Sequence, residues 1–165
     1  MPTTTDRVIY LLRASTDESQ LAIVQIELSG KTITPGQVFA ADENWLRNLK
    51  IRITNLSDKP ITSFVLSGGL IGGVNEKLTT FESYEEGIAW KFGEYSDPKS
   101  GGEKRKGITL LSNQVVELGY ESMDPYYNNA REFERGSFCK LELGPASIQF
   151  EDGTTETASR IKYKR

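Results

Sequence analysis

Residues 49–73, LKIRITNLSDKPITSFVLSGGLIGG, carry the clearest structural pattern in the chain. Apolar and polar residues alternate through 49–54, and a polar turn containing Asp58 and Pro60 precedes a second apolar run. Alternation with a period of two is typical of a strand with one buried face, whereas Asp and Pro disfavour continuing a strand. The stretch therefore predicts two strands joined by a tight turn. The residues of the first strand predicted to point inward are Leu49, Ile51 and Ile53.

Short runs with similar alternation recur along the chain, separated by Gly, Asn, Asp and Pro. Many short strands with polar turns between them are typical of an all-β domain, and antiparallel sheets permit one face to remain in water. About seven to nine such strands favour a sandwich over a barrel. We therefore expect an antiparallel β-sandwich. The further strands are predicted within residues 7–13, 21–30, 61–68, 108–120, 137–144, 146–154 and 160–164.

Some of these runs carry more specific predictions. Asp152-Gly153 is a hairpin signal, because both residues tolerate the positive φ angles of a type I′ turn. Ser112-Asn113 interrupts two apolar runs and is either a bulge or a turn between two strands. In the strand predicted at 21–30, one face is formed by Ala22, Val24, Ile26 and Leu28.

Helix signals occur in two places. Asp124 can act as an N-cap before Pro125, and Gly136 can end a helix, so at most one short helix is expected near residues 124–135. The run DENWLRNL at 42–49 is compatible with a single helical turn before the strand that follows it.

Composition bounds the class of protein. The chain has 165 residues, which predicts one domain spanning 1–165 with a core that needs no disulfide or metal. A net charge of −3 gives no general attraction to nucleic acid, and the lack of a long apolar run predicts no membrane insertion. One cysteine and no histidine exclude an internal disulfide, His- or Cys-based zinc sites and Ser-His-Asp catalysis. No cofactor is expected.

The N-terminal residues MPTTTDRV lack the charged and apolar segments of a signal peptide. The sequence is therefore compatible with a cytoplasmic protein, or with an exported one whose native leader is not present in this chain.

Gly68, Gly69, Gly72 and Gly73 raise the question of a ligand-binding loop. A Walker-type loop ends in Gly-Lys-Ser/Thr, and a dinucleotide fingerprint is followed by a helix. The sequence continues VNEKLTTFES, which has neither feature. We therefore predict that the glycines mark a strand end, a bulge or a tight corner.

Three segments together resemble uncharacterised, mostly exported bacterial immunoglobulin-like domains. ITNLSDKPI resembles the pattern V-x-N-x-S-x-K-P-I of an opening strand–turn–strand, VVELGY resembles a later edge strand, and ASIQFEDGTTE resembles a closing V-x-F-x-D-G-T hairpin. The sequence departs from the pattern in having Ser112-Asn113 where Pro-Gly is usual. The resemblance implies an immunoglobulin-like or fibronectin-III-like sandwich and favours export to the periplasm or outside the cell. It implies no catalytic residue, because such folds host unrelated functions.

The excursion at 74–107 is long for a hairpin connection, and long loops in compact domains are usually functional or disordered. Its aromatics are compatible with a platform for a sugar or a peptide. The favoured alternative is that they pack over an open sheet edge, with AWKFGEY as a short extra strand, because aromatics are more often buried than displayed. The speculative binding residues, including two tyrosines of the predicted helix, are Tyr84, Trp90, Phe92, Tyr95, Tyr126 and Tyr127.

Other chemistry-bearing residues give weaker signals. Glu82, Glu85 and Glu86 form an acidic cluster, but no calcium-loop pattern accompanies them. Clusters of charged residues usually face solvent, so a surface position is favoured over a metal or catalytic site. Cys139 is in phase with Leu141 on a predicted strand, which predicts a buried core residue and not a nucleophile.

Three functions remain open on the sequence alone. The first is a non-catalytic binding or structural module for an unknown partner, either a protein or a carbohydrate. The second is a carbohydrate-active enzyme that uses carboxylates, and the third is a subunit that assembles through an exposed strand edge. Two carboxylates facing each other across a cleft would favour the enzyme, whereas a flat aromatic strip would favour the module.

Overall fold

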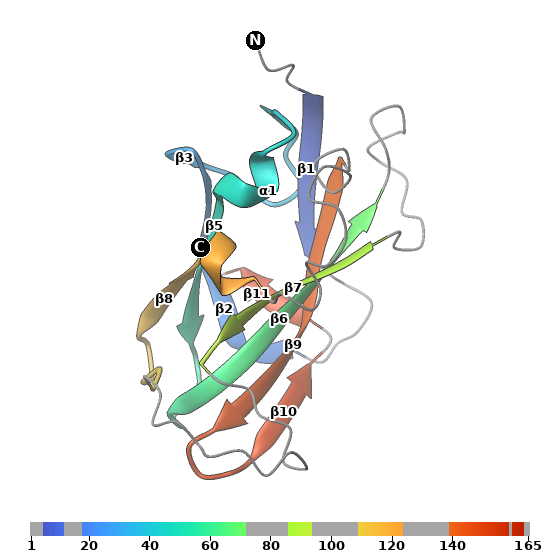
Figure 1. The fold of residues 1–165 in the computed structure, drawn as a ribbon. Helices are drawn as coiled ribbons and strands as arrows, with labels where there is room; N and C mark the ends of the chain where they lie inside the picture. The colour runs from blue at the N-terminus through green and yellow to red at the C-terminus, as the bar shows by residue number, and fades with distance from the viewer. Residues whose placement is uncertain are drawn as a thin grey trace.

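The computed structural model describes residues 5–11, 18–71, 86–93, 109–123, 139–158 and 160–163 (Figure 1). The elements of this part of the chain are β1 (Thr5–Leu11), β2 (Glu18–Leu28), β3 (Lys31–Thr32), β4 (Phe39–Ala41), α1 (Trp45–Asn48), β5 (Leu49–Asn55), β6 (Ile61–Ile71), β7 (Glu86–Phe92), β8 (Val115–Leu118), the 3-10 turn η1 (Tyr120–Ser122), β9 (Lys140–Phe150), β10 (Thr155–Ala158) and β11 (Arg160–Tyr163).

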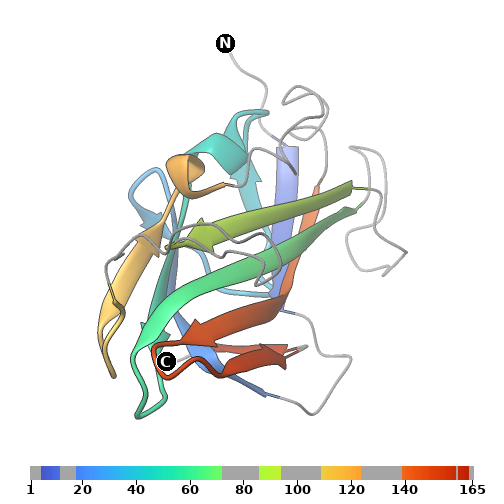
Figure 2. The same cartoon turned by 60° about the horizontal axis from the view of Figure 1, so that its bottom comes forward.

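The strands form two sheets (Figure 2). The first sheet has the order β4-β1-β9-β6-β7, with β10 paired to β9. The second sheet has the order β11-β2-β5-β8, with β3 paired to β2. Apolar side chains from both sheets form one buried cluster. The predicted all-β sandwich is therefore confirmed.

Two of the nine described strand pairings are parallel, which the sequence pattern did not predict. β1 lies parallel to β9, and β11 lies parallel to β2. The first and the last described strands, β1 and β11, are therefore each paired within a sheet. Alternation reports which face of a strand is buried, but it does not report the direction of the neighbouring strand.

β5 lies between β2 and β8 and has the predicted alternation of exposure through Ile53, whereas Thr54, expected to be exposed, is buried. Leu49, Ile51 and Ile53 are fully buried, whereas Lys50 and Arg52 on the opposite face are exposed. The buried residues of β5 therefore form the centre of the inner face of the second sheet.

The predicted inner face of β2 is partly wrong because the strand contains a bulge. The register with β5 shifts between Ile23 and Gln25, so Val24 has no direct partner on β5. One extra residue reverses the phase of alternation. Ile23 and Ile26 are accordingly both in the core cluster, whereas Val24 is only partly buried. Ala22 is buried but lies outside this cluster.

β9 is one strand where the sequence predicted two. Its pairing with β6 shifts register between Leu66 and Gly68, opposite the Gly144-Pro145 step. Proline and glycine are tolerated in a strand at such irregularities, although in sequence they look like a turn. The strand therefore continues through this step from Lys140 to Phe150.

The Ser112-Asn113 pair forms a turn that carries the chain from one sheet to the other. Leu110 exchanges backbone hydrogen bonds with Ile61 of β6 (2.8 and 2.9 Å), and Asn113 has a positive φ of 63°. The residues that follow form β8, which pairs with β5 of the second sheet. Of the two alternatives, the turn is therefore correct.

The predicted hairpin at Asp152-Gly153 forms, but its turn type was predicted wrongly. Only Gly153 has a positive φ in this turn (88°), and its N–H donates to the carbonyl of Phe150 (3.0 Å). The N–H of Phe150 donates in turn to the carbonyl of Thr154 (2.9 Å). This is the geometry of a type I turn followed by a left-handed glycine, and not of a type I′ turn.

α1 is the single helical turn predicted within 42–49. Trp45 of this turn is buried, and the Arg7 guanidinium of β1 lies 5.3 Å from the centroid of its ring. Arg7 Nε also donates to the carbonyl of Ala41 (3.1 Å). These contacts close one end of the sandwich. The helix predicted near 124–135 lies outside the described residues, within which no helix is long and apolar enough to span a membrane.

Candidate functional site

Two of the predicted aromatic site residues, Trp90 and Phe92, lie on β7, the extra strand predicted from AWKFGEY. Trp90 is fully buried in the core, so it offers no face to a ligand, which corrects the expectation for this residue. Phe92 is half-buried and stacks on Phe64 of β6, with ring centroids 5.2 Å apart. These aromatics pack on the sheet, as the favoured alternative predicted. The other predicted site residues, Tyr84, Tyr95, Tyr126 and Tyr127, lie outside the described residues.

Gly68 makes room for the ring of Trp90. Gly68 and Gly69 lie inside β6 and not at its end, and Gly72 and Gly73 fall outside the described residues. A Cβ atom at position 68 would lie 3.3 Å from Cζ3 of Trp90 and 3.1 Å from a core leucine side chain. Gly68 therefore allows side chains to pack closely beside a register shift, and it does not form a phosphate-binding loop.

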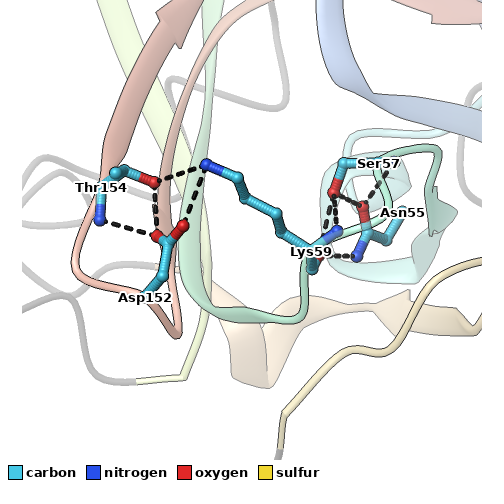
Figure 3. A network of polar contacts seen from close by, with 5 residues as sticks. All are labelled: Asn55, Ser57, Lys59, Asp152 and Thr154. Carbon is cyan, nitrogen blue, oxygen red and sulfur yellow. Dashed lines mark hydrogen bonds and ion pairs between the residues drawn. The ribbon is translucent and has the colours of Figure 1, made fainter.

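The polar turn after β5 and the polar turn after β9 meet in space. Asn55 and Ser57 form the β5–β6 turn, where the backbone N–H of Ser57 donates to Asn55 Oδ1 (2.9 Å). Asn55 Nδ2 donates to the carbonyl of Lys59 (2.8 Å). The Lys59 side chain reaches the β9–β10 turn, where its Nζ lies 2.9 Å from Asp152 Oδ2 and donates to Thr154 Oγ1 at 3.3 Å (Figure 3). These contacts therefore hold the two turns together.

The environment of Asp152 favours its charged form. The pKa of Asp152 is lowered from 3.8 to about 2, first because the Thr154 hydroxyl donates to it, then because of the Thr154 backbone N–H and the Lys59 ammonium. The carboxylate is exposed, so solvent screens its attraction to Lys59. Its role is to order the hairpin turn, and its oxygens are already engaged by the chain.

Paired charges cover the outer face of the second sheet. Arg52 Nε lies 3.1 Å from Glu117 Oε2, and Arg52 Nη2 lies 3.8 Å from Glu27 Oε2. Lys50 Nζ lies 3.8 Å from Glu117 Oε1. These carboxylates lie beside cations on a sheet face. They do not form the facing pair across a cleft that a glycoside hydrolase requires.

Two charged residues of β9 are buried, which sequence reasoning missed. Lys140 is 1% exposed and Glu142 is 8% exposed. They lie on the face of the first sheet that points away from the core, beside Val8 and Tyr10 of β1. Alternation assigns this face to solvent, so nothing in the pattern predicts its burial. Cys139 is buried, as predicted.

The open edge of β8 is the exposed feature best suited to binding. Asn55 N–H donates to the carbonyl of Gln114, and Leu56 N–H donates to the carbonyl of Gln20, so alternate residues of β5 point toward β8 and toward β2. Val115 and Glu117 lie opposite Thr54 and Arg52, the residues of β5 that do not point toward β8. The backbone N–H and C=O groups of Val115 and Glu117 therefore point away from β5. In both cartoon views β8 lies at the outer left, with no described strand beyond it (Figures 1 and 2).

Exposed apolar side chains concentrate next to this edge. Of the four large apolar residues that are strongly exposed among those described, three lie within residues 111–120: Leu111 (52%), Val115 (51%) and Tyr120 (39%). The fourth is Val38 (55%), which lies between β3 and β4.

No protein-family model matches the sequence, and neither a curated protein nor a solved structure is detectably similar to the chain. Any function proposed for the chain therefore rests on the geometry of its described residues.

The described residues include no group of three or more His, Cys, Asp or Glu side chains placed to hold a metal ion. Glu82 and Glu85 of the predicted acidic cluster lie outside the described residues.

Proposed function

We propose that this domain is a non-catalytic binding or structural module of the immunoglobulin-like type that engages a protein partner through the edge of β8. The observation that carries the proposal is the open edge itself. The backbone groups of Val115 and Glu117 point away from the sheet, beside the exposed side chains of Leu111 and Tyr120.

A strand edge favours a protein partner over a carbohydrate. An extended peptide supplies backbone donors and acceptors at the spacing of the edge, and its side chains cover neighbouring apolar groups. Many proteins shorten or charge their edge strands to prevent such pairing. β8 is short, but Val115 at its open edge is apolar and half exposed.

The enzyme alternative gains no support from the described carboxylates that form ion pairs. Glu27 and Glu117 lie beside Arg52, and Asp152 lies beside Lys59. Each of these carboxylates already has a structural partner.

The proposal is tested by selecting peptides from a random phage-displayed library on the folded domain. We expect selected peptides to protect the amides of Val115 and Glu117 from hydrogen exchange. Val115→Pro should weaken their binding by at least about tenfold, because it removes an outward donor that β5 does not use. Val38→Ala, at an exposed apolar site away from β8, should leave binding unchanged.

Peptides that bind elsewhere, or that bind Val115→Pro as well as the native domain, would refute the edge as the binding site. Hydrolysis of a panel of aryl glycosides by the pure domain would replace the proposal with the enzyme alternative.

A further inference from the structure

We infer that the partner of the β8 edge is a second copy of this chain, related by a twofold axis through Val116. The inference rests on the proposed function and names the partner of the same edge. Antiparallel pairing of β8 with itself would join the two second sheets into one continuous sheet, a self-complementary interface of the kind that closed dimers use.

The backbone selects the register of this pairing. In an antiparallel ladder, directly opposed residues that point toward each other exchange two hydrogen bonds. With the axis at Val116, Val115 opposes Glu117 of the second copy and Glu117 opposes Val115 of the second copy. Every outward group of these two residues is then paired, because both residues point outward.

The two neighbouring registers are worse for identifiable reasons. An axis at Val115 places Glu117 opposite Asn113 of the second copy, whose N–H already donates to the carbonyl of Asn55 (2.8 Å). An axis at Glu117 places two glutamates directly opposite each other, which is unfavourable. It also places Val115 opposite Gly119, whose N–H donates to Ser122 Oγ (3.3 Å).

The exposed side chains agree with the same register. Glu117 then lies opposite Val115 of the second copy and not opposite a like charge, and it keeps its contact with Arg52 on the outer face. Leu111 precedes β8 and Tyr120 follows it. Antiparallel pairing therefore brings the Leu111 end of one copy beside the Tyr120 end of the other, which covers both exposed side chains.

The test is sedimentation velocity of the full chain from about 10 μM to about 1 mM, because a short edge predicts a weak dimer. The native chain should shift from monomer to dimer over this range. Val115→Glu should remain monomeric, since it opposes two glutamates across the interface. Val115→Lys should still dimerise, because it opposes lysine to glutamate. Val38→Glu is the matched control, at an equally exposed valine, and should behave as the native chain does.

A cross-linking experiment tests the register independently. Residues opposed as a hydrogen-bonded pair have Cα atoms about 5.5 Å apart, within the range of a disulfide. The double variant Val115→Cys/Glu117→Cys should therefore form a disulfide-linked dimer on mild oxidation, and Val115→Cys alone should not. Cys139 is buried and does not interfere.

A native chain that stays monomeric at about 1 mM would overturn the inference. If the selected peptides nevertheless bind the native domain and lose affinity for Val115→Pro, the proposed function stands and only the identity of the partner is wrong. Dimerisation that Val115→Glu leaves unchanged would also overturn the inference, by placing the interface elsewhere.

Discussion

Replacing Ile53 by alanine tests the packing of the two sheets at its centre. Ile53 is fully buried on β5, between Ile23 of β2 and Val116 of β8. The substitution removes three carbons, and each buried carbon contributes about 0.8 kcal/mol, which gives roughly 2.4 kcal/mol before any cavity forms. A residual cavity adds to this loss, so we expect the free energy of unfolding to fall by about 2–5 kcal/mol.

Urea unfolding followed by tryptophan fluorescence measures this loss, with Val38→Ala as the exposed control. The control should change the free energy of unfolding by less than about 0.5 kcal/mol. An equally small loss for Ile53→Ala, with an unchanged m-value, would show that Ile53 does not face the core. The phase of β5, and with it the outward direction of Val115 and Glu117, would then be wrong.

Three further predictions concern packing, charge and metal. Gly68→Ala should lower the free energy of unfolding by about 1 kcal/mol or more, because the new Cβ crowds the core; an unchanged urea midpoint would show that the core is looser there. Asp152, with its pKa lowered to about 2, should stabilise the fold above pH 3.8 and lose this contribution as the pH falls through about 2. In a carboxyl NMR titration, Thr154→Val should raise this pKa more than Lys59→Met does, and the reverse order would contradict the assigned causes. Melting curves with and without a chelator should superimpose, and a fall of several degrees with the chelator would indicate a cation site.

The sequence predicted strands best where one face of the strand is exposed to solvent and the other is buried. β5 was predicted in phase and extent, because its charged residues Lys50 and Arg52 alternate with buried ones. β2 was predicted within 21–30 and spans Glu18–Leu28, and its phase was predicted only in part, because a bulge at Val24 leaves no mark in the composition. The parallel pairing of β1 with β9 was not predicted, because the partner of a strand depends on the whole chain.

The candidate site was less predictable than the fold. Trp90 was a reasonable ligand-stacking residue in sequence, but Gly68 on the neighbouring strand β6 leaves space for its ring in the core. Lys140 and Glu142 alternate in sequence with apolar residues, a pattern typical of a solvent-facing side, but both are buried. An open strand edge depends on which strands are neighbours, so the sequence could suggest edge assembly as a class of function without locating it at β8.

The polar motifs NLSDK and EDGT have a structural role, which the contacts of Lys59 show. Its side chain joins the turn after β5 to the turn after β9, and its partner Asp152 is already engaged by Thr154. Residues whose polar groups bond to one another in this way fix the relative position of two hairpins. Few of their donors and acceptors remain available to bind a ligand. Proteins that share these motifs can therefore share a fold and still bind different partners. We propose that binding takes place instead where backbone groups point outward from a sheet, and among the described residues Val115 and Glu117 of β8 are the clearest such place.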